Sequence, residues 1–454
     1  MVHPLLLLAL VQAPTDLPSG APTPSPSGTR PQAETPAAPA PPAPAQDARL
    51  ARLEAELAAL RRELAAARAE DTARHDEQVA ALTAEIEQLR SGAGSAAAAD
   101  RLRLGGYGEI HYNDRDGAGG SQIDLHRFVV YLGYRLSDDI QLHSETELEH
   151  AYVEDGNGEL AIEQLFLDFR VAPATHVEVG RMLAPLGIVN QRHEPPTFNG
   201  VERPSVETVV LPTTWSMDGV GLAGELSPAV RYRLMITSSL DGSEFSALNG
   251  IRGGRQKERP SLNEPAFSGR IDFFPQAGGE GADGDSSLRL GVSGFYGGLD
   301  NGNQGNDPGV NGDLWIASAD AEFSLGRLDL RGVAAWEGIS GASDLSGATG
   351  ESISSAITGW YVEAAWHCLP DSWSGDGRGL HDAVVFARYD DIDTQRNVPS
   401  GFTRDPAGDR SEWTLGVGLY PLANLALKAD YQIRDDEASK RPASQLNLGV
   451  GWSL

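Results

Sequence analysis

Residues 139–153 read DIQLHSETELEHAYV, and their alternation decides the fold. In a β-strand, successive side chains point to opposite faces of the sheet. The even-numbered positions of this stretch include the apolar residues Ile140, Leu142, Leu148 and Tyr152, with the small residues Ser144 and Thr146 between them. The other parity is polar and acidic, and consists of Gln141, His143, Glu145, Glu147 and Glu149. A row of acids opposite an apolar row indicates a strand with water on one side and an extended apolar phase on the other.

Similar alternating runs recur to the end of the chain. The run before it, RFVVYLGYRL, sets Phe128, Val130 and Leu132 against Arg127, Tyr131 and Arg135. We count about sixteen such runs between residues 103 and 454. The connections between them alternate between short turns, near residues 137, 172, 227, 326 and 421, and long polar loops, at 185–217, 241–265, 299–311, 340–356 and 393–409.

This order of connections predicts an all-β protein, a transmembrane antiparallel β-barrel. Barrels of the bacterial outer membrane have short turns at the periplasmic end and longer loops outside, with apolar residues facing lipid and polar ones facing the lumen. A closed barrel also pairs every backbone group without helices. Aromatic residues that lie in or near the runs are expected to form girdles at the lipid–water boundaries: Tyr107, Trp315, Trp336, Trp360, Trp413, Tyr420 and Trp452.

Composition excludes several other classes of protein. The longest apolar run, Leu5 to Val11, is far shorter than the roughly 18 residues that a spanning helix needs. The net charge of −28 argues against a nucleic-acid partner, which needs clustered Lys and Arg. The single Cys368 excludes an intrachain disulfide and fits no zinc spacing, and no cofactor or metal motif is found. No nucleophile elbow or other catalytic signature occurs either.

The first hundred residues predict export and self-association. Residues 1–13 resemble a secretory signal peptide, and residues 14–46 form a Pro- and Ala-rich disordered linker. Residues 47–92 place leucines at alternating spacings of three and four, which predicts a coiled coil; a lone solvated helix is the alternative. Residues 93–102 form a small-residue hinge before the barrel at 103–454, so the N-terminal region is expected in the periplasm.

The stretch from Gly180 to Leu226 carries a family resemblance. GRMLAPLGIVNQRHEPPTFNGVERPSVETVVLPTTWSMDGVGLAGEL is similar to the segment that follows the fifth strand in phosphate-selective porins of the O and P type. The resemblance implies a 16-stranded, trimeric porin in the outer membrane of a Gram-negative cell. Phosphate selectivity in that family relies on rows of Arg and Lys, whereas this chain has 64 acidic against 36 basic residues. Phosphate specificity is therefore not expected.

The expected function is passive diffusion of small hydrophilic or ionic solutes through a water-filled channel, with outer-membrane lipid around the barrel. Two alternatives remain open. The coiled coil could tether the outer membrane to the cell wall, with the barrel as an anchor. The barrel could also be an outer-membrane hydrolase, because a catalytic triad is recognised by geometry and not by sequence position.

The loop at 185–217 is the expected constriction. It follows the fifth strand, and its prolines limit its conformations. We expect its cations, with Arg181 on the preceding strand, to face the acids of the opening stretch across the lumen, or else to pin the loop to the wall by ion pairs. The expected pore-lining residues are Arg181, Arg192, His193, Arg203, Glu145, Glu147, Glu149, Arg127 and Arg135.

Overall fold

The structure, a computed structural model, describes residues 101–116, 120–153, 158–255, 259–275, 286–299, 312–370, 373, 380–439 and 441–454. The expected signal peptide, linker and coiled coil, and the hinge up to residue 100, lie outside the described residues. The chain divides into two compact units, residues 1–90 and 91–454, and the described residues all belong to the second unit.

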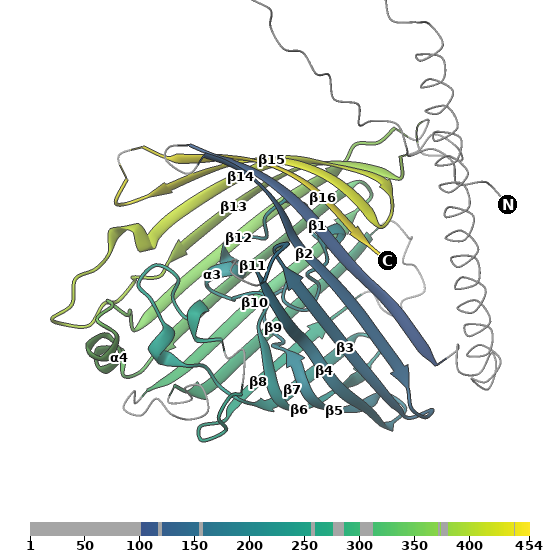
Figure 1. Cartoon of the computed structure of the whole chain (residues 1–454), viewed down its shortest axis with the longest axis horizontal. Helices are drawn as coiled ribbons and strands as arrows, with labels where there is room; N and C mark the ends of the chain where they lie inside the picture. The colour runs from purple at the N-terminus through teal and green to yellow at the C-terminus, as the bar shows by residue number, and fades with distance from the viewer. Residues whose placement is uncertain are drawn as a thin grey trace, which may run out of the picture. The chain divides into compact units, whose positions relative to one another are not determined.

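The described residues form sixteen strands that close into one antiparallel barrel, as the sequence pattern predicts (Figure 1). Each strand pairs with its neighbours in the chain, and the first strand pairs with the last. The strands are β1 (Leu102–Arg115), β2 (Gly120–Arg135), β3 (Ile140–Glu149), β4 (Glu159–Ala172), β5 (Thr175–Leu183), β6 (Ser216–Ser227), β7 (Val230–Thr237), β8 (Ala266–Phe273), β9 (Ser286–Gly298), β10 (Asp313–Leu325), β11 (Leu328–Ile339), β12 (Ala356–His367), β13 (Asp382–Asp393), β14 (Asp409–Leu422), β15 (Leu425–Asp436) and β16 (Ala443–Ser453).

The described helices are short and lie in the long loops. They are the α-helices α3 (Val206–Val209) and α4 (Ala342–Thr349), and the 3₁₀-helices η1 (Pro195–Thr197), η2 (Gly242–Glu244), η3 (Arg252–Gly254) and η5 (Pro406–Gly408). None of these described helices has the length and apolar character needed to traverse a bilayer. Helix α3 lies within the ring of strands, and α4 lies at the end of the barrel that carries the long loops (Figure 1).

The alternation of side chains places an apolar surface outside. On β2, Phe128, Val130 and Leu132 are 40%, 42% and 38% exposed, whereas Val129 between them is 0% exposed because it points into the barrel. Four of the aromatic residues expected in the girdles, Trp315, Trp336, Trp360 and Trp413, are exposed on this outer surface. Tyr107 and Tyr420 are buried instead, so the expectation that they face lipid is wrong.

The connections differ from the expected pattern at one end. Turns at residues 136–139, 173–174, 228–229 and 326–327 are short, as expected, but 274–285 and 368–381 at the same end are long. The expected turn at Pro421 and Leu422 is also displaced to residues 423–424. A shift of register between Leu419 and Leu422 lets β14 continue through these residues.

Two bulges break the strict alternation on β2 and β4. The register of β1 with β2 shifts at His126, and that of β3 with β4 shifts at Glu163. A bulge inserts one residue opposite a regular strand and turns its side chain to a new direction. As a result, Glu163 is buried on the lumen side. The neighbouring Gln164 is half-buried, and its amide contacts Glu145.

Gly180 on β5 provides a test of the barrel's close strand packing. It adopts φ of 139°, and a Cβ atom there would lie 2.3 Å from the backbone oxygen of Leu165 on β4. Because neither backbone can move without breaking the pairing, we expect Gly180→Ala to destabilise the barrel by about 1–3 kcal/mol. Urea unfolding of the full chain in detergent measures this change. Gly133→Ala on β2, whose Cβ would meet its nearest atom at 3.5 Å, is the matched control; equal unfolding midpoints for the two variants would contradict the packing.

Candidate functional site

The connection between β5 and β6, residues 184–215, fills part of the lumen and is here named the lumen loop. Inward-facing side chains of distant strands hold its backbone. Lys428 on β15 is buried and donates hydrogen bonds to the carbonyl oxygens of Pro195, Phe198 and Gly200, at 2.6, 2.5 and 2.9 Å. Its ammonium also lies 4.0 Å from the centre of the Phe198 ring. One cation therefore fixes the η1 turn of the loop against the wall.

Acidic residues of the wall hold the loop from other sides. Asp430 on β15 accepts a hydrogen bond from the backbone N–H of Val201 at 2.6 Å, and Asp390 on β13 accepts one from Val206 at 3.2 Å. These carboxylates accept from backbone groups that would otherwise be buried without partners.

Glu207 in α3 organises the interior of the loop. The side chain is fully buried and accepts hydrogen bonds from the backbone N–H groups of Ile188 and Val189, at 2.5 and 2.7 Å, and from the hydroxyl of Tyr361 on β12, at 2.7 Å. Burial raises the pKa of Glu207, and these donors act in the opposite direction. The loop is thus a fixed structure with its own polar centre.

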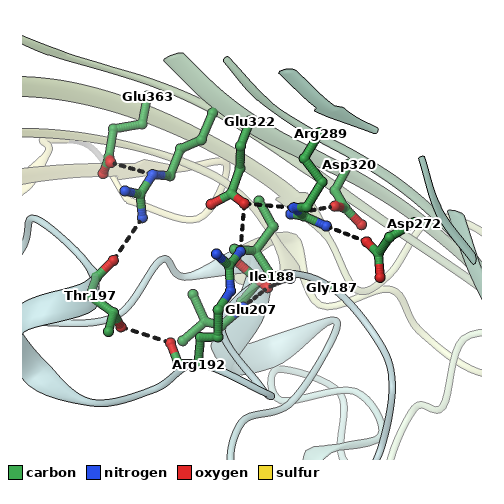
Figure 2. Close-up of polar contacts among 12 residues, drawn as sticks. Gly187, Ile188, Arg192, Thr197, Glu207, Asp272, Arg289, Asp320, Glu322 and Glu363 are labelled. Atoms are coloured by element: carbon green, nitrogen blue, oxygen red, sulfur yellow. Dashed lines mark hydrogen bonds and ion pairs between the residues drawn. The ribbon is translucent and has the colours of Figure 1, made fainter. Parts of the chain in front are cut away.

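Arg192 points to a row of charged side chains on the opposite wall (Figure 2). Its guanidinium lies 2.6 Å from Glu322 on β10, which also accepts from Arg289 on β9 at 2.7 Å. The row continues with Asp272 and Asp320, both bound by Arg289. The sequence analysis left open whether the arginines of the loop face Glu145, Glu147 and Glu149 or pin the loop to the wall. Arg192 follows the second alternative, because its ion pair with Glu322 pins the loop to the wall.

The lumen beside the loop is apolar along part of the wall, which the sequence pattern did not predict. At the long-loop ends of β5 to β13, inward-facing residues such as Met182, Met217, Met235 and Phe295 are buried against Trp215 of the loop. These strands therefore carry apolar side chains on both faces near this end. Burial of this apolar surface stabilises the loop inside the barrel. The rest of the inner wall is left open to water.

A cavity of about 800 Å³, here named the outer cavity, lies along that remaining wall. It is lined by the lumen loop, by the first strands, β1 to β4, and by the last strands, β14 to β16. Carboxylates of β3 and β4 and arginines of β5 and two loops are among its lining residues. Its acidic lining residues on these strands are Glu147, Glu149, Glu159 and Glu163, and its arginines from β5 and the loops are Arg181, Arg203, Arg252 and Arg255.

The three loop arginines of the outer cavity are bound mainly to backbone oxygens. Arg203 donates to the carbonyl of His193 at 3.3 Å, Arg252 to that of Thr208 at 2.5 Å, and Arg255 to that of Thr214 at 2.5 Å. Among the residues that the structure describes, none of these three forms an ion pair with a carboxylate. Burial lowers the pKa of Arg255 to about 10, with a further contribution from Arg252 and Arg203. The three positive charges therefore lie close to one another beside the cavity.

The other predicted residues lie on the wall of β2 to β5. Arg127 is buried between Glu109 and Glu147, at 2.6 and 3.1 Å, and lies 3.8 Å from Glu149. Arg181 forms a two-point ion pair with Asp218 on β6, both contacts being 2.8 Å. Arg135 lines a second, inner cavity of about 370 Å³, together with Glu145 and His143. The acidic row of the opening stretch thus spans both cavities.

His193 lies where the two cavities approach each other. Glu145 lines the inner cavity, Glu163 lines the outer cavity, and the Nε2 atom of His193 is 3.4 and 3.5 Å from one oxygen of each. The structure therefore brings His193 together with Glu145. Sequence analysis missed Glu163 because it is the bulge residue, and missed Arg252, Arg255 and Lys428 because each lies on an element remote in sequence from the lumen loop.

Comparison with known proteins finds one curated relative. No family model matches the chain. A protein of Aquifex aeolicus (strain VF5), described as an uncharacterized protein, is 33% identical over 368 residues, which cover 77% of this chain and 79% of that protein.

Solved structures with a similar fold include several outer-membrane proteins. The anion-selective porin from Comamonas acidovorans is 12% identical, with a TM-score of 0.49, over 78% of this chain and 99% of the porin. The outer membrane channel DcaP of Acinetobacter baumannii is 12% identical, with a TM-score of 0.48, over 78% and 97%. At this similarity, neither protein indicates which solutes this chain transports.

Lys428 provides a test of how the lumen loop is held. Replacing it with Met removes three hydrogen bonds from a charged donor, each worth about 1.5–3 kcal/mol, so the loop should open at least about a hundredfold more often. Trypsin cleavage after Arg192, followed by mass spectrometry on the folded barrel, reports this opening. Leu427→Met on the lipid-facing side of the same strand is the control. Equal cleavage rates in wild type and Lys428→Met would show that Lys428 does not hold the loop.

Proposed function

We propose that this chain, which belongs to the same family as the Aquifex aeolicus protein, is a porin of the Gram-negative outer membrane through which small hydrophilic or ionic solutes diffuse passively. The observation that carries the proposal is the closed sixteen-stranded barrel with an apolar outer surface and charged cavities inside. In lipid, a closed barrel is the form of β-sheet that leaves no unpaired edge. A smaller apolar core could stabilise a barrel as well as this large charged lumen does. The lumen is therefore not needed for stability.

The proposed route for solutes follows the wall of β1 to β4 and β14 to β16. The outer cavity is lined along this wall by polar side chains, whereas the apolar contacts of the lumen loop occupy the side of β5 to β13. Charged groups lower the cost of moving an ion from bulk water into a narrow space. We therefore place the conducting path to one side of the lumen, with the lumen loop as its constriction.

The charges along this route support a weak preference for cations with a local contact for anions. Glu147, Glu149 and Glu159 line the same cavity as Arg203, Arg252 and Arg255. Opposed charges in a narrow water-filled gap produce a transverse field, which orients ions and polar solutes. Acidic residues outnumber basic ones in the chain, 64 against 36, which supports the weak preference for cations.

The biological assembly that we propose is a homotrimer in outer-membrane lipid, with the N-terminal region in the periplasm. The resemblance of residues 180–226 to porins of the O and P type supports the trimer, and the exposed apolar belt of strands such as β2 supports the lipid environment. The signal peptide and the coiled coil at 47–92 remain predictions from the sequence.

Planar-bilayer recordings test the proposed pore and its charges. The full chain should give stepwise ion conductance, which a closed anchor would not give. Neutralising Glu147, Glu149 and Glu159 together to Gln should shift the reversal potential in a salt gradient toward anions. Replacing Arg203, Arg252 and Arg255 with Gln should shift it toward cations. A unit charge roughly 10 Å away in water contributes about 0.4 kcal/mol, so each triple change should alter the permeability ratio several-fold at low ionic strength.

The control variant is Asp344→Asn, which removes an exposed charge on α4, away from the residues that line the outer cavity. It should leave the reversal potential unchanged. Conductance with no response to either triple variant would contradict the proposed route, and absence of conductance steps from the folded protein would contradict the proposed function itself.

A further inference from the structure

Three side chains at the boundary between the two cavities are buried with polar atoms that lack hydrogen-bond partners. Glu145, Glu163 and His193 are 2%, 4% and 2% exposed. The unpartnered atoms are Oε1 of Glu145, both carboxylate oxygens of Glu163, and Nε2 of His193. Leaving such groups buried and unpaired costs about 1–3 kcal/mol each, and more where the group is charged. Their convergence on one point indicates that the site is built to hold something further.

The surroundings orient these atoms. Nδ1 of His193 lies 3.0 Å from the backbone oxygen of Asn190, and because a carbonyl can only accept, Nδ1 must donate a proton. A neutral imidazole in this tautomer directs the lone pair of Nε2 toward the two carboxylates. The amide of Gln164 donates to the other oxygen of Glu145, Oε2. Such outer contacts are typical of histidine and carboxylate ligands of metal ions.

The two distances from His193 also match those of a coordination sphere. Nε2 of His193 is 3.4 Å from Glu145 and 3.5 Å from Glu163. Bonds of roughly 2.0–2.2 Å from zinc to nitrogen and oxygen, arranged tetrahedrally, place neighbouring ligand atoms roughly 3.3–3.6 Å apart. One ligand atom from each of the three residues falls within 4.8 Å of the other two.

We propose that Glu145, Glu163 and His193 bind a divalent transition-metal ion, of which Zn²⁺ fits the geometry, and that this ion fastens the lumen loop to β3 and β4. Two carboxylates and one neutral imidazole balance the charge of a dication. The fourth position is open to water, as in other zinc sites with three protein ligands. Because Glu163 lines the outer cavity and Glu145 the inner one, an ion can reach the site from the lumen.

A proton is the competing occupant of Nε2 on His193. A histidine that binds a metal must be neutral, so binding of Zn²⁺ releases any proton held there.

A second cluster, made of one aspartate and two histidines, serves as an internal control. Nδ1 of His126 and Nδ1 of His150 lie 3.3 and 2.7 Å from the same oxygen of Asp124. None of these atoms is left without a hydrogen-bond partner, and the cluster is only partly buried. Their polar groups are satisfied by one another, so nothing there requires an ion.

Calorimetric titration of Zn²⁺ into the chelator-treated full chain in detergent tests the proposal. Wild type and His150→Gln should each bind one Zn²⁺ tightly. His193→Gln and Glu163→Gln should lose at least the roughly 10–100-fold in affinity that removal of an outer-shell contact costs in metal sites. Heat-modifiability on gels shows which variants are folded. Absence of a tight site in wild type, or loss of it in His150→Gln with retention in His193→Gln, would overturn the proposal.

A measurement on the wild-type protein keeps the test independent of variant folding. Crystals soaked in Zn²⁺ should show an anomalous difference peak between Glu145, Glu163 and His193. A zinc peak only at Asp124, His126 and His150, or none, would overturn the proposal.

The expected effect of Zn²⁺ on conduction rests on the proposed porin function, whereas the binding of Zn²⁺ does not. Zn²⁺ should lower the conductance of wild type and leave that of folded His193→Gln unchanged, because the ion ties the loop across the boundary between the cavities. A protein that binds Zn²⁺ at this site but never conducts would contradict the proposed porin function and leave the metal site established.

Discussion

Pairing of β1 with β16 is the constraint on which the rest of the structure depends. Between Tyr107 and Arg115, β1 pairs with the last strand residue by residue, so the sheet has no free edge. In lipid an unpaired backbone group costs several kcal/mol, and closure removes that cost from β1 and β16, which would otherwise be edge strands. Closure also separates the two faces of every strand, one toward an apolar exterior and one toward an enclosed lumen. All polar chemistry of the barrel is therefore confined to one side of the sheet.

The lumen loop has to satisfy its own backbone within this enclosed space. It does so with side chains of the wall, because a segment of this irregular shape cannot pair with itself throughout. Lys428 donates hydrogen bonds to three of its carbonyl oxygens. Asp430 and Asp390 accept hydrogen bonds from two of its N–H groups. On its other side, Trp215 packs among apolar residues of β5 to β13. A loop with one polar and one apolar contact surface divides the lumen unequally and leaves the charged cavities on one wall.

The sequence predicts the barrel well because period-two alternation follows directly from strand geometry. The acids of residues 139–153 and the apolar row of β2 lie on opposite faces, as that alternation requires. The sequence predicts the site less well, for identifiable reasons. Glu163 lies at a bulge, where alternation fails. Met217 and Met235 point inward although their type is typical of the lipid face, because the lumen loop covers them. Arg252 and Arg255 reach the outer cavity from another loop, and spacing along the chain contains no signal for that approach.

We place the path of water and solutes along the wall of β1 to β4 and β14 to β16, and the opposite side of the lumen is closed by apolar packing at the long-loop ends of its strands. Two inward-facing alanines test it directly in the Cys368→Ser background: Ala161 on β4 lines the outer cavity, and Ala335 on β11 lies in the apolar cluster. Single cysteines at each position can be treated with a charged, membrane-impermeant thiol reagent during bilayer recording. If solutes follow this wall, we expect rapid modification and a fall in conductance at Ala161→Cys, with neither at Ala335→Cys. Modification and block at Ala335→Cys with no effect at Ala161→Cys would contradict it.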